Sequence, residues 1–149
     1  MTKSIRDVLK NKGSSIVSVS ANETVYKALE LMARENIGAL LVINEGKVVG
    51  IMSERDYARK VILEGLSSLK TAVKKIMTNK VLYISPDQSV EEGLALMSDK
   101  RCRHLPVFED GTLIGLVSIG DLVQANVAEK EFMLSQLEKL HSQWVCELE

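Results

Sequence analysis

Hydrophobic positions along the chain follow two spacings, and the same succession occurs twice. Residues 25–32 and 90–97 carry apolar side chains at three- or four-residue intervals, which predicts two amphipathic helices. Each is followed by a continuous apolar run, IGALLVI or HLPVF, of the kind typical of a buried strand. Turns around NEGK and EDGT then lead into KVVGIM and TLIGLV, so each run predicts a hairpin.

An internal duplication accounts for this recurrence. Shifting the sequence on itself by 65 positions aligns the two patterns without a gap, and similar lead-ins, IRDVL and VKKIM, precede the repeats at a shift of 68. Periodicity alone does not explain matched turns and polar residues. The matched pairs include Ser20 with Ser85, Val25 with Val90, Met32 with Met97, Leu40 with Leu105, Gly46 with Gly111, Gly50 with Gly115, Ser53 with Ser118, and Asp56 with Asp121.

Each repeat predicts the order strand, helix, strand, strand, helix, which is an α+β arrangement. We assign residues 1–66 to the first repeat, 67–127 to the second and 128–149 to a C-terminal tail. The connection between the repeats is short and partly apolar, so we expect it to belong to one packed unit. Loops differ between the repeats, because the first carries extra residues near KNKGSS.

From Leu122 onward the spacing predicts one long helix, with apolar residues recurring through Trp144 and Leu148. A small domain has no remaining surface against which such a stripe can be buried. We predict that the tail packs on a partner subunit. The alternative is a helix that folds back on its own domain.

Composition narrows the functional classes. The chain has 149 residues, with 19 Lys and Arg against 20 Asp and Glu, so no overall charge favours nucleic acid or an anionic membrane. No apolar run approaches a membrane span, and the polar start MTKSIRD does not match a secretory signal. We therefore predict a cytoplasmic protein. Cys102 and Cys146 lack the paired spacing of a metal site or redox motif.

The duplicated motifs GIMSERD and GLVSIGD, together with HLPV and a glycine hairpin, resemble the tandem cystathionine-beta-synthase (CBS) domain family, also called the Bateman module. The resemblance runs from Ile5 to about Val127. It implies a pseudo-twofold pair of half-domains with two clefts between them, commonly assembled into a disc-like dimer. It also implies an adenosine-containing ligand such as AMP, ADP, ATP, NAD or S-adenosylmethionine.

The repeated Ser-x-x-Asp motif has two interpretations. A serine at a helix start lies beside unpaired backbone N–H groups and suits a phosphate, whereas an aspartate one turn later can accept hydrogen bonds from both ribose hydroxyls. The structural alternative is a helix cap, with serine at the N-cap and aspartate favoured by the helix dipole. The motif occurs at Ser53 and Asp56, the first corner, and at Ser118 and Asp121, the second corner.

Arg101, Arg103 and His104 immediately precede a predicted buried strand. Removing a cation from water at such a position costs free energy unless an anion pairs with it. The cluster therefore favours phosphate binding at the second repeat. The alternative is a set of surface ion pairs with Asp99 or Glu109.

The family resemblance assigns these residues to two different clefts. In cleft A, adenine lies against the first repeat, ribose on Asp121, and phosphate near the cations of the second repeat. Cleft B uses the first corner, and Arg55 and Arg59 either contact phosphate there or form an exposed helix face. We expect cleft A to bind more tightly. Cleft A comprises Ile37, Gly38, Ala39, Ser118, Asp121, Arg103 and His104, and cleft B comprises Ser53, Asp56, Cys102, Arg103, Arg55 and Arg59.

No catalytic or metal constellation is evident. We predict a non-enzymatic sensor that binds an adenine nucleotide (AMP, ADP, ATP, NAD or NADH) and alters a homodimer or a regulated partner protein. The alternative is an interaction protein whose clefts are empty, and the resemblance to plant relatives implies that it modulates a redox enzyme. Cys102 is either a packing residue or a thiol activated by neighbouring arginines.

Overall fold

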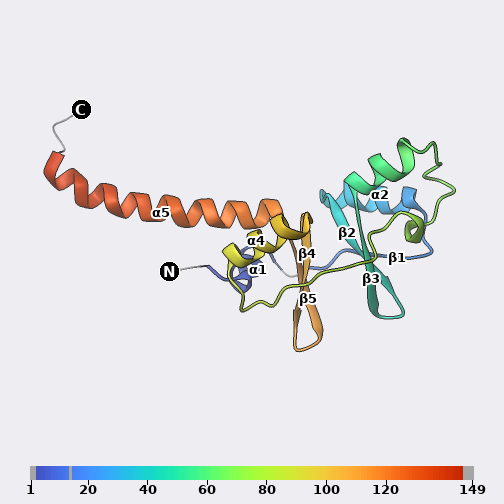
Figure 1. The fold of residues 1–149 in the computed structure, drawn as a ribbon, viewed down its shortest axis with the longest axis horizontal. Helices are drawn as coiled ribbons and strands as arrows, with labels where there is room; N and C mark the ends of the chain where they lie inside the picture. The colour runs from blue at the N-terminus through green and yellow to red at the C-terminus, as the bar shows by residue number, and fades with distance from the viewer. Residues whose placement is uncertain (1–2, 14, 146–149) are drawn as a thin grey trace. The chain divides into compact units, whose positions relative to one another are not determined.

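The computed structural model describes residues 3–13 and 15–145, with side chains through residue 139. These residues form two compact units (Figure 1). The first unit spans residues 15–83, and the second combines the N-terminal segment with the chain from Ile84 onward. Both units mix helices and small sheets, as the duplication predicts.

The first unit contains the complete predicted repeat. Its three-stranded sheet has the order β1-β2-β3, with β1 parallel and β3 antiparallel to β2. The helices α2 and α3 follow β1 and β3 along the chain. The elements are β1 (Ser18–Ser20), α2 (Val25–Glu35), β2 (Ala39–Asn44), β3 (Lys47–Ser53), α3 (Glu54–Tyr57), the π-helical turn η1 (Ala58–Ile62) and the 3-10 turn η2 (Val73–Lys75).

The second unit departs from the first at its opening strand. The stretch VLYIS forms only one parallel bridge, between Ile84 and Val107. In the first unit the Leu41 N–H donates to the Val17 carbonyl (3.3 Å), but Pro106 occupies the position matched to Leu41 and has no N–H. The ladder is shorter for this reason. The elements are α1 (Ile5–Lys12), α4 (Val90–Lys100), β4 (His104–Glu109), β5 (Thr112–Ser118) and α5 (Ile119–Val145).

The two hairpin turns share a backbone conformation. Glu45 and Gly46 have φ of 52° and 78°, and Asp110 and Gly111 have φ of 50° and 79°. Two consecutive positive φ angles match the tight turn whose twist suits antiparallel strands. The hairpins predicted from NEGK and EDGT are therefore confirmed.

The second strand of each hairpin carries a glycine against a lead-in segment. A Cβ on Gly50 would lie 2.6 Å from Met77 Sδ and 2.9 Å from the Thr78 carbonyl oxygen, whereas one on Gly115 would lie 2.7 Å from Leu9 Cδ2. Glycine allows this approach without any movement of the facing segment. The lead-in that precedes the first repeat in sequence thus packs on the second repeat, and VKKIM packs on the first.

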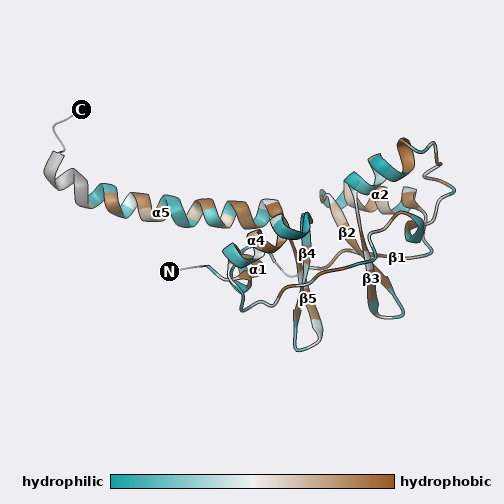
Figure 2. Cartoon of the chain, viewed as in Figure 1, coloured by the Kyte–Doolittle hydropathy of each residue, from teal (hydrophilic) through white to brown (hydrophobic). Residues whose placement is uncertain are grey.

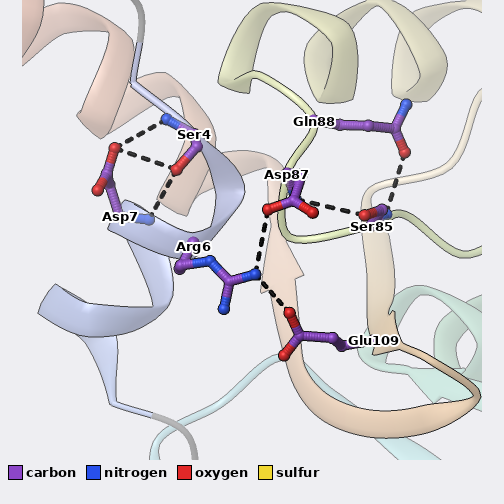
Figure 3. A network of polar contacts seen from close by, with 7 residues as sticks. All are labelled: Ser4, Arg6, Asp7, Ser85, Asp87, Gln88 and Glu109. Carbon is purple, nitrogen blue, oxygen red and sulfur yellow. Dashed lines mark hydrogen bonds and ion pairs between the residues drawn. The ribbon is translucent and has the colours of Figure 1, made fainter.

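Polar contacts also anchor α1 to the second repeat (Figure 3). Arg6 extends its guanidinium to Asp87 (3.1 Å) and to Glu109. The Ile5 N–H donates to the Gln88 carbonyl (2.9 Å), and Ile5 is fully buried with Val8 and Leu9 in the core of this unit. The helix is therefore part of the second unit rather than a loose extension.

The predicted long tail helix is present as α5, beginning at Ile119 rather than Leu122. Leu122 is fully buried near its start. From Glu131 to Lys139 every side chain is exposed, and bands of hydrophobic and hydrophilic residues follow one another along α5 (Figure 2). These residues do not fold back on their own domain. Among the described helices, none combines the length and apolar character needed to cross a bilayer.

Candidate functional site

Both corners are helix caps at the end of a hairpin. Ser53 ends β3 and Ser118 ends β5, and in each case the next residue begins a helix. The aspartate N–H donates to the serine Oγ at 3.1 Å in both corners, and the serine N–H donates to the aspartate Oδ2 at 3.0 Å in the first and 2.8 Å in the second. The capping interpretation is therefore correct for the backbone. Ligand binding depends on which side-chain atoms the cap leaves available.

In the first corner the cap uses every side-chain oxygen. The Ser53 hydroxyl donates to Asp56 Oδ2 (3.1 Å), and Lys60 Nζ lies 3.2 Å from Asp56 Oδ1. Asp56 is further enclosed, with a side-chain exposure of 14%. Asp56 Oδ1 thus keeps at most one acceptor site, and a diol that uses both oxygens would have to displace an existing partner from Oδ2.

The second corner keeps one carboxylate oxygen unengaged. Within the described part of the chain, Asp121 Oδ1 has no donor, because Oδ2 receives both the Ser118 N–H and Lys12 Nζ (2.6 Å). The Ser118 hydroxyl also interacts with this carboxylate and helps to lower the pKa of Asp121. A free carboxylate oxygen suits a ribose hydroxyl, and a serine hydroxyl can donate to a phosphate oxygen in place of the carboxylate. The two corners therefore share a backbone and differ in available chemistry.

A third Ser-x-x-Asp cap starts α1 and provides an internal standard. Ser4 N–H and Ser4 Oγ both donate to Asp7 Oδ2, at 3.0 and 3.1 Å. The backbone and hydroxyl of Ser4 lower the pKa of Asp7. This cap shares the hydroxyl contact of the first corner, but Asp7 Oδ1, like Asp121 Oδ1, has no donor among the described residues. The second corner therefore differs from both other caps in the lysine of a distant helix that lies on its Oδ2.

Opposing influences act on the second-corner carboxyl. Burial acts to raise the pKa of Asp121, but hydrogen bonds from Lys12 and from the Ser118 backbone hold it below its ordinary value. The side chain is therefore an anion at neutral pH, which is the form that accepts hydroxyl donors on both oxygens.

The lysines at the corners were missed by the sequence analysis. Lys60 lies four residues after Asp56 in the same helical segment, so its spacing was a usable signal. Lys12 comes from α1, and its approach to Asp121 depends on the packing of that helix with the second repeat. No local pattern indicates that contact.

The start of each first hairpin strand lies beside the corner of its own unit. The Ile119 N–H donates to the Arg103 carbonyl (2.8 Å), and the Glu54 N–H donates to the Gly38 carbonyl (3.0 Å). In strand register, His104 pairs with Ser118. The structure thus gathers the predicted groups into two sets: Arg103, His104, Ser118 and Asp121 in the second unit, and Ile37, Gly38, Ala39, Ser53 and Asp56 in the first.

The charges around the two strand starts differ. Arg101 and Arg103 are exposed, and neither joins an ion pair with another described residue, because Glu109 pairs with Arg6 and Asp99 with Lys100 (3.7 Å). The alternative of surface ion pairs with Asp99 or Glu109 is therefore not found for these two arginines in the described ranges. At the first strand start, a Cβ on Gly38 would lie 3.5 Å from Glu54 Oε1. Anionic ligand groups are thus favoured at the second unit.

The remaining candidates have less distinctive surroundings. Arg55 and Arg59 are exposed, which is compatible with either predicted role. Cys102 is half-buried against the core of the second unit, and burial raises the pKa of its thiol, so the reactive thiolate is disfavoured. Cys146 lies outside the described residues. No cluster of metal-ligating side chains occurs in the described ranges.

Comparisons with known proteins agree with this architecture. The CBS domain family matches residues 4–63 and 73–128. The Arabidopsis thaliana "CBS domain-containing protein CBSX3, mitochondrial" is 43% identical over 142 residues, covering 89% of this chain and 69% of the relative.

Solved structures show the same fold. A putative signal-transduction protein with CBS domains from Burkholderia ambifaria MC40-6 is 50% identical, with a TM-score of 0.82 over 85% of this chain and 95% of that one. A CBS domain pair in complex with 5′-methylthioadenosine and S-adenosyl-L-methionine has a TM-score of 0.76 over 87% of this chain and 99% of that one. At 24% identity, the second likeness concerns the fold alone.

Proposed function

This chain belongs to the CBS domain family, and from that premise we propose that it is a non-catalytic sensor that binds an adenine nucleotide at the second corner. CBS domain pairs are typically regulatory, ligand-binding modules. The proposed ligand is AMP, ADP, ATP, NAD or NADH. One CBS pair of the same fold is described in complex with two adenosine-containing compounds, which supports this ligand class.

The open carboxylate oxygen of the second corner, next to an exposed arginine, carries the proposal. Asp121 Oδ1 offers an acceptor for ribose, and the Ser118 hydroxyl, which interacts with Asp121, can donate to a phosphate instead. Arg103 lies beside them through the hydrogen bond from Ile119 to its carbonyl, and it has no carboxylate partner in the described structure. A nucleoside phosphate combines a diol and an anion, so it matches both sets of groups.

The family resemblance supplies the adenine side of the proposed site, cleft A. In the proposed complex adenine lies against Ile37, Gly38 and Ala39, whose small side chains and backbone groups suit a flat ring. Phosphate meets Ser118, Arg103 and His104. Cleft B, with Ser53, Asp56, Cys102, Arg103, Arg55 and Arg59, binds more weakly because Asp56 is already engaged on both oxygens.

A thermal-shift screen tests the proposed ligand class. A ligand that binds only the folded state must raise the melting temperature, by an amount that grows with its concentration over Kd. We expect at least one of AMP, ATP, NAD, NADH and S-adenosyl-L-methionine to do so, with GTP as the matched control. Unchanged melting with every adenine compound would favour the alternative function, an interaction protein with empty clefts.

We propose that occupancy is transmitted to a second copy of the chain through α5. Leu134 and Leu137 are 57% and 60% exposed, and they lie three residues apart on one face of the helix. Burying this stripe against a second α5 removes apolar surface from water. A regulated partner protein is the other proposed target.

The dimer proposal predicts that acidic residues in place of Leu134 and Leu137 lower the mass of the particle in solution. Leu134→Glu with Leu137→Glu should convert a dimer to a monomer in sedimentation velocity, because carboxylates would enter an apolar interface. The control is Ser135→Glu, a charge on another exposed position of α5. A wild-type monomer at the highest attainable concentration would contradict the dimer.

The cytoplasmic location stays a prediction. The Arabidopsis relative is named as a mitochondrial protein, and fractionation of the native source distinguishes the two locations.

A further inference from the structure

Lys12 is the last residue of α1, and its ammonium group lies against the second corner. Its Nζ is 2.6 Å from Asp121 Oδ2 and 2.8 Å from the Leu116 carbonyl oxygen. Gly13 follows with φ of 94° and closes the helix by donating its N–H to Leu9 (2.8 Å). The chain then continues into the first repeat. The ion pair therefore fixes α1 immediately before the chain leaves the second unit.

This contact fills the carboxylate oxygen that a ribose would need. Asp121 Oδ2 already accepts hydrogen bonds from the Ser118 N–H (2.8 Å) and from Lys12, and one carboxylate oxygen has about two lone-pair sites. A cis-diol that donates one hydroxyl to each oxygen must take one of those sites. The Ser118 N–H is held by the cap, so Lys12 is the partner that can leave.

We propose that Lys12 competes with the ligand's ribose for Asp121, so that binding of a ribonucleoside opens the Lys12–Asp121 ion pair and releases the end of α1. The inference rests on the proposed function, because it takes Asp121 as the ribose-binding acid. It deepens that function by naming a residue that sets affinity for the ribose and a route by which occupancy reaches the segment that leads from α1 into the first repeat.

The first corner shows why the position of Lys12 matters. Lys60 also joins an aspartate to a carbonyl, at 3.2 Å from Asp56 Oδ1 and 3.0 Å from the Ile76 oxygen. However, Lys60 is only four residues from Asp56, so opening that pair leaves both groups in one continuous helical segment. Lys12 and Asp121 belong to helices far apart in sequence. Opening their pair removes a tie between two elements.

The exposure of the pair makes exchange feasible. The side chains of Lys12 and Asp121 are 37% and 25% exposed, and ion pairs at such positions change an equilibrium by about fivefold or less. A ligand that gains hydrogen bonds to an anionic carboxylate can offset a cost of that size.

Titration calorimetry with adenosine and 2′-deoxyadenosine tests the competition directly. Both compounds are uncharged, so removing a lysine does not alter a phosphate interaction. In Lys12→Met, which keeps the aliphatic chain, adenosine should bind about fivefold more tightly, matching the ion pair that no longer has to open. The 2′-deoxyadenosine affinity should not change, because one hydroxyl can use Oδ1. Lys10→Met, on an exposed position of α1, should leave both affinities unchanged.

Hydrogen exchange of the last turn of α1 provides a second readout that needs no variant. In the wild-type protein, adenosine should accelerate exchange of the Gly13 amide, and in Lys12→Met exchange should be fast and insensitive to adenosine. If adenosine binds wild type and Lys12→Met equally and exchange is unaffected, the competition is wrong and the proposed function stands. If adenosine and the adenine nucleotides bind neither protein, both proposals are wrong.

Discussion

The two repeats are built from the same motifs and yet present different surfaces at equivalent positions. Asp56 and Asp121 occupy matched corners, but Asp56 is engaged on both oxygens whereas Asp121 is engaged on one. The strand starts differ as well, with an acidic Glu54 beside Gly38 and, beside Ile119, an Arg103 whose side chain joins no ion pair with another described residue. Duplication thus preserved the backbone, while residues outside the shared motif determine the chemistry of each copy.

The packing of the two hairpin glycines also differs between the repeats. Substituting them gives the largest expected effect on stability. Gly50→Ala places a methyl group 2.9 Å from the Thr78 carbonyl, which is backbone, whereas Gly115→Ala meets only the Leu9 side chain. Backbone cannot move aside cheaply, so we expect Gly50→Ala to lower the free energy of unfolding by about 3 kcal/mol and Gly115→Ala by about 1 kcal/mol. Urea denaturation measures both values.

Gly120→Ala is the control for these two glycines. A Cβ at Gly120 meets its nearest atom at 3.6 Å, which is ordinary contact, and the residue is helical, so the substitution should be neutral or slightly stabilising. An equal loss in the free energy of unfolding for Gly50→Ala and Gly115→Ala would contradict this difference, because it would show that both lead-in segments move aside equally well.

Much of the fold could be predicted because it depends on local pattern. The hairpins follow from apolar runs separated by Glu-Gly and Asp-Gly turns, and the corners follow from a hydroxyl ahead of a carboxylate. The single bridge at Ile84 was not predicted, although Pro106 in the sequence implies a missing donor.

The site was harder to predict because its chemistry depends on packing between distant segments. The roles of Ser118 and Asp121 rest on which of their atoms the cap leaves open, and a motif does not specify that. Lys12 reaches Asp121 only because α1 packs on the second repeat. Spacing along the chain does not indicate that the lead-in before the first repeat packs on the second repeat.

A smaller expected effect, measured on AMP affinity, separates the two corners. Asp121→Asn removes the anionic acceptor while its amide oxygen can still receive the Ser118 N–H, so the cap is retained. Hydrogen bonds to a charged group contribute roughly 2 kcal/mol, so AMP should bind about 30-fold more weakly. Asp56→Asn should change AMP affinity by less than about threefold, because Asp56 is already engaged.

Calorimetric titration of AMP into wild type, Asp121→Asn, Asp56→Asn and Asp7→Asn is the most direct test. The prediction is a large loss of affinity confined to Asp121→Asn, with Asp7→Asn indistinguishable from wild type and melting temperatures similar across the set. Unchanged affinity in Asp121→Asn, or an equal loss in Asp56→Asn, would contradict the assignment of the second corner as the nucleotide site.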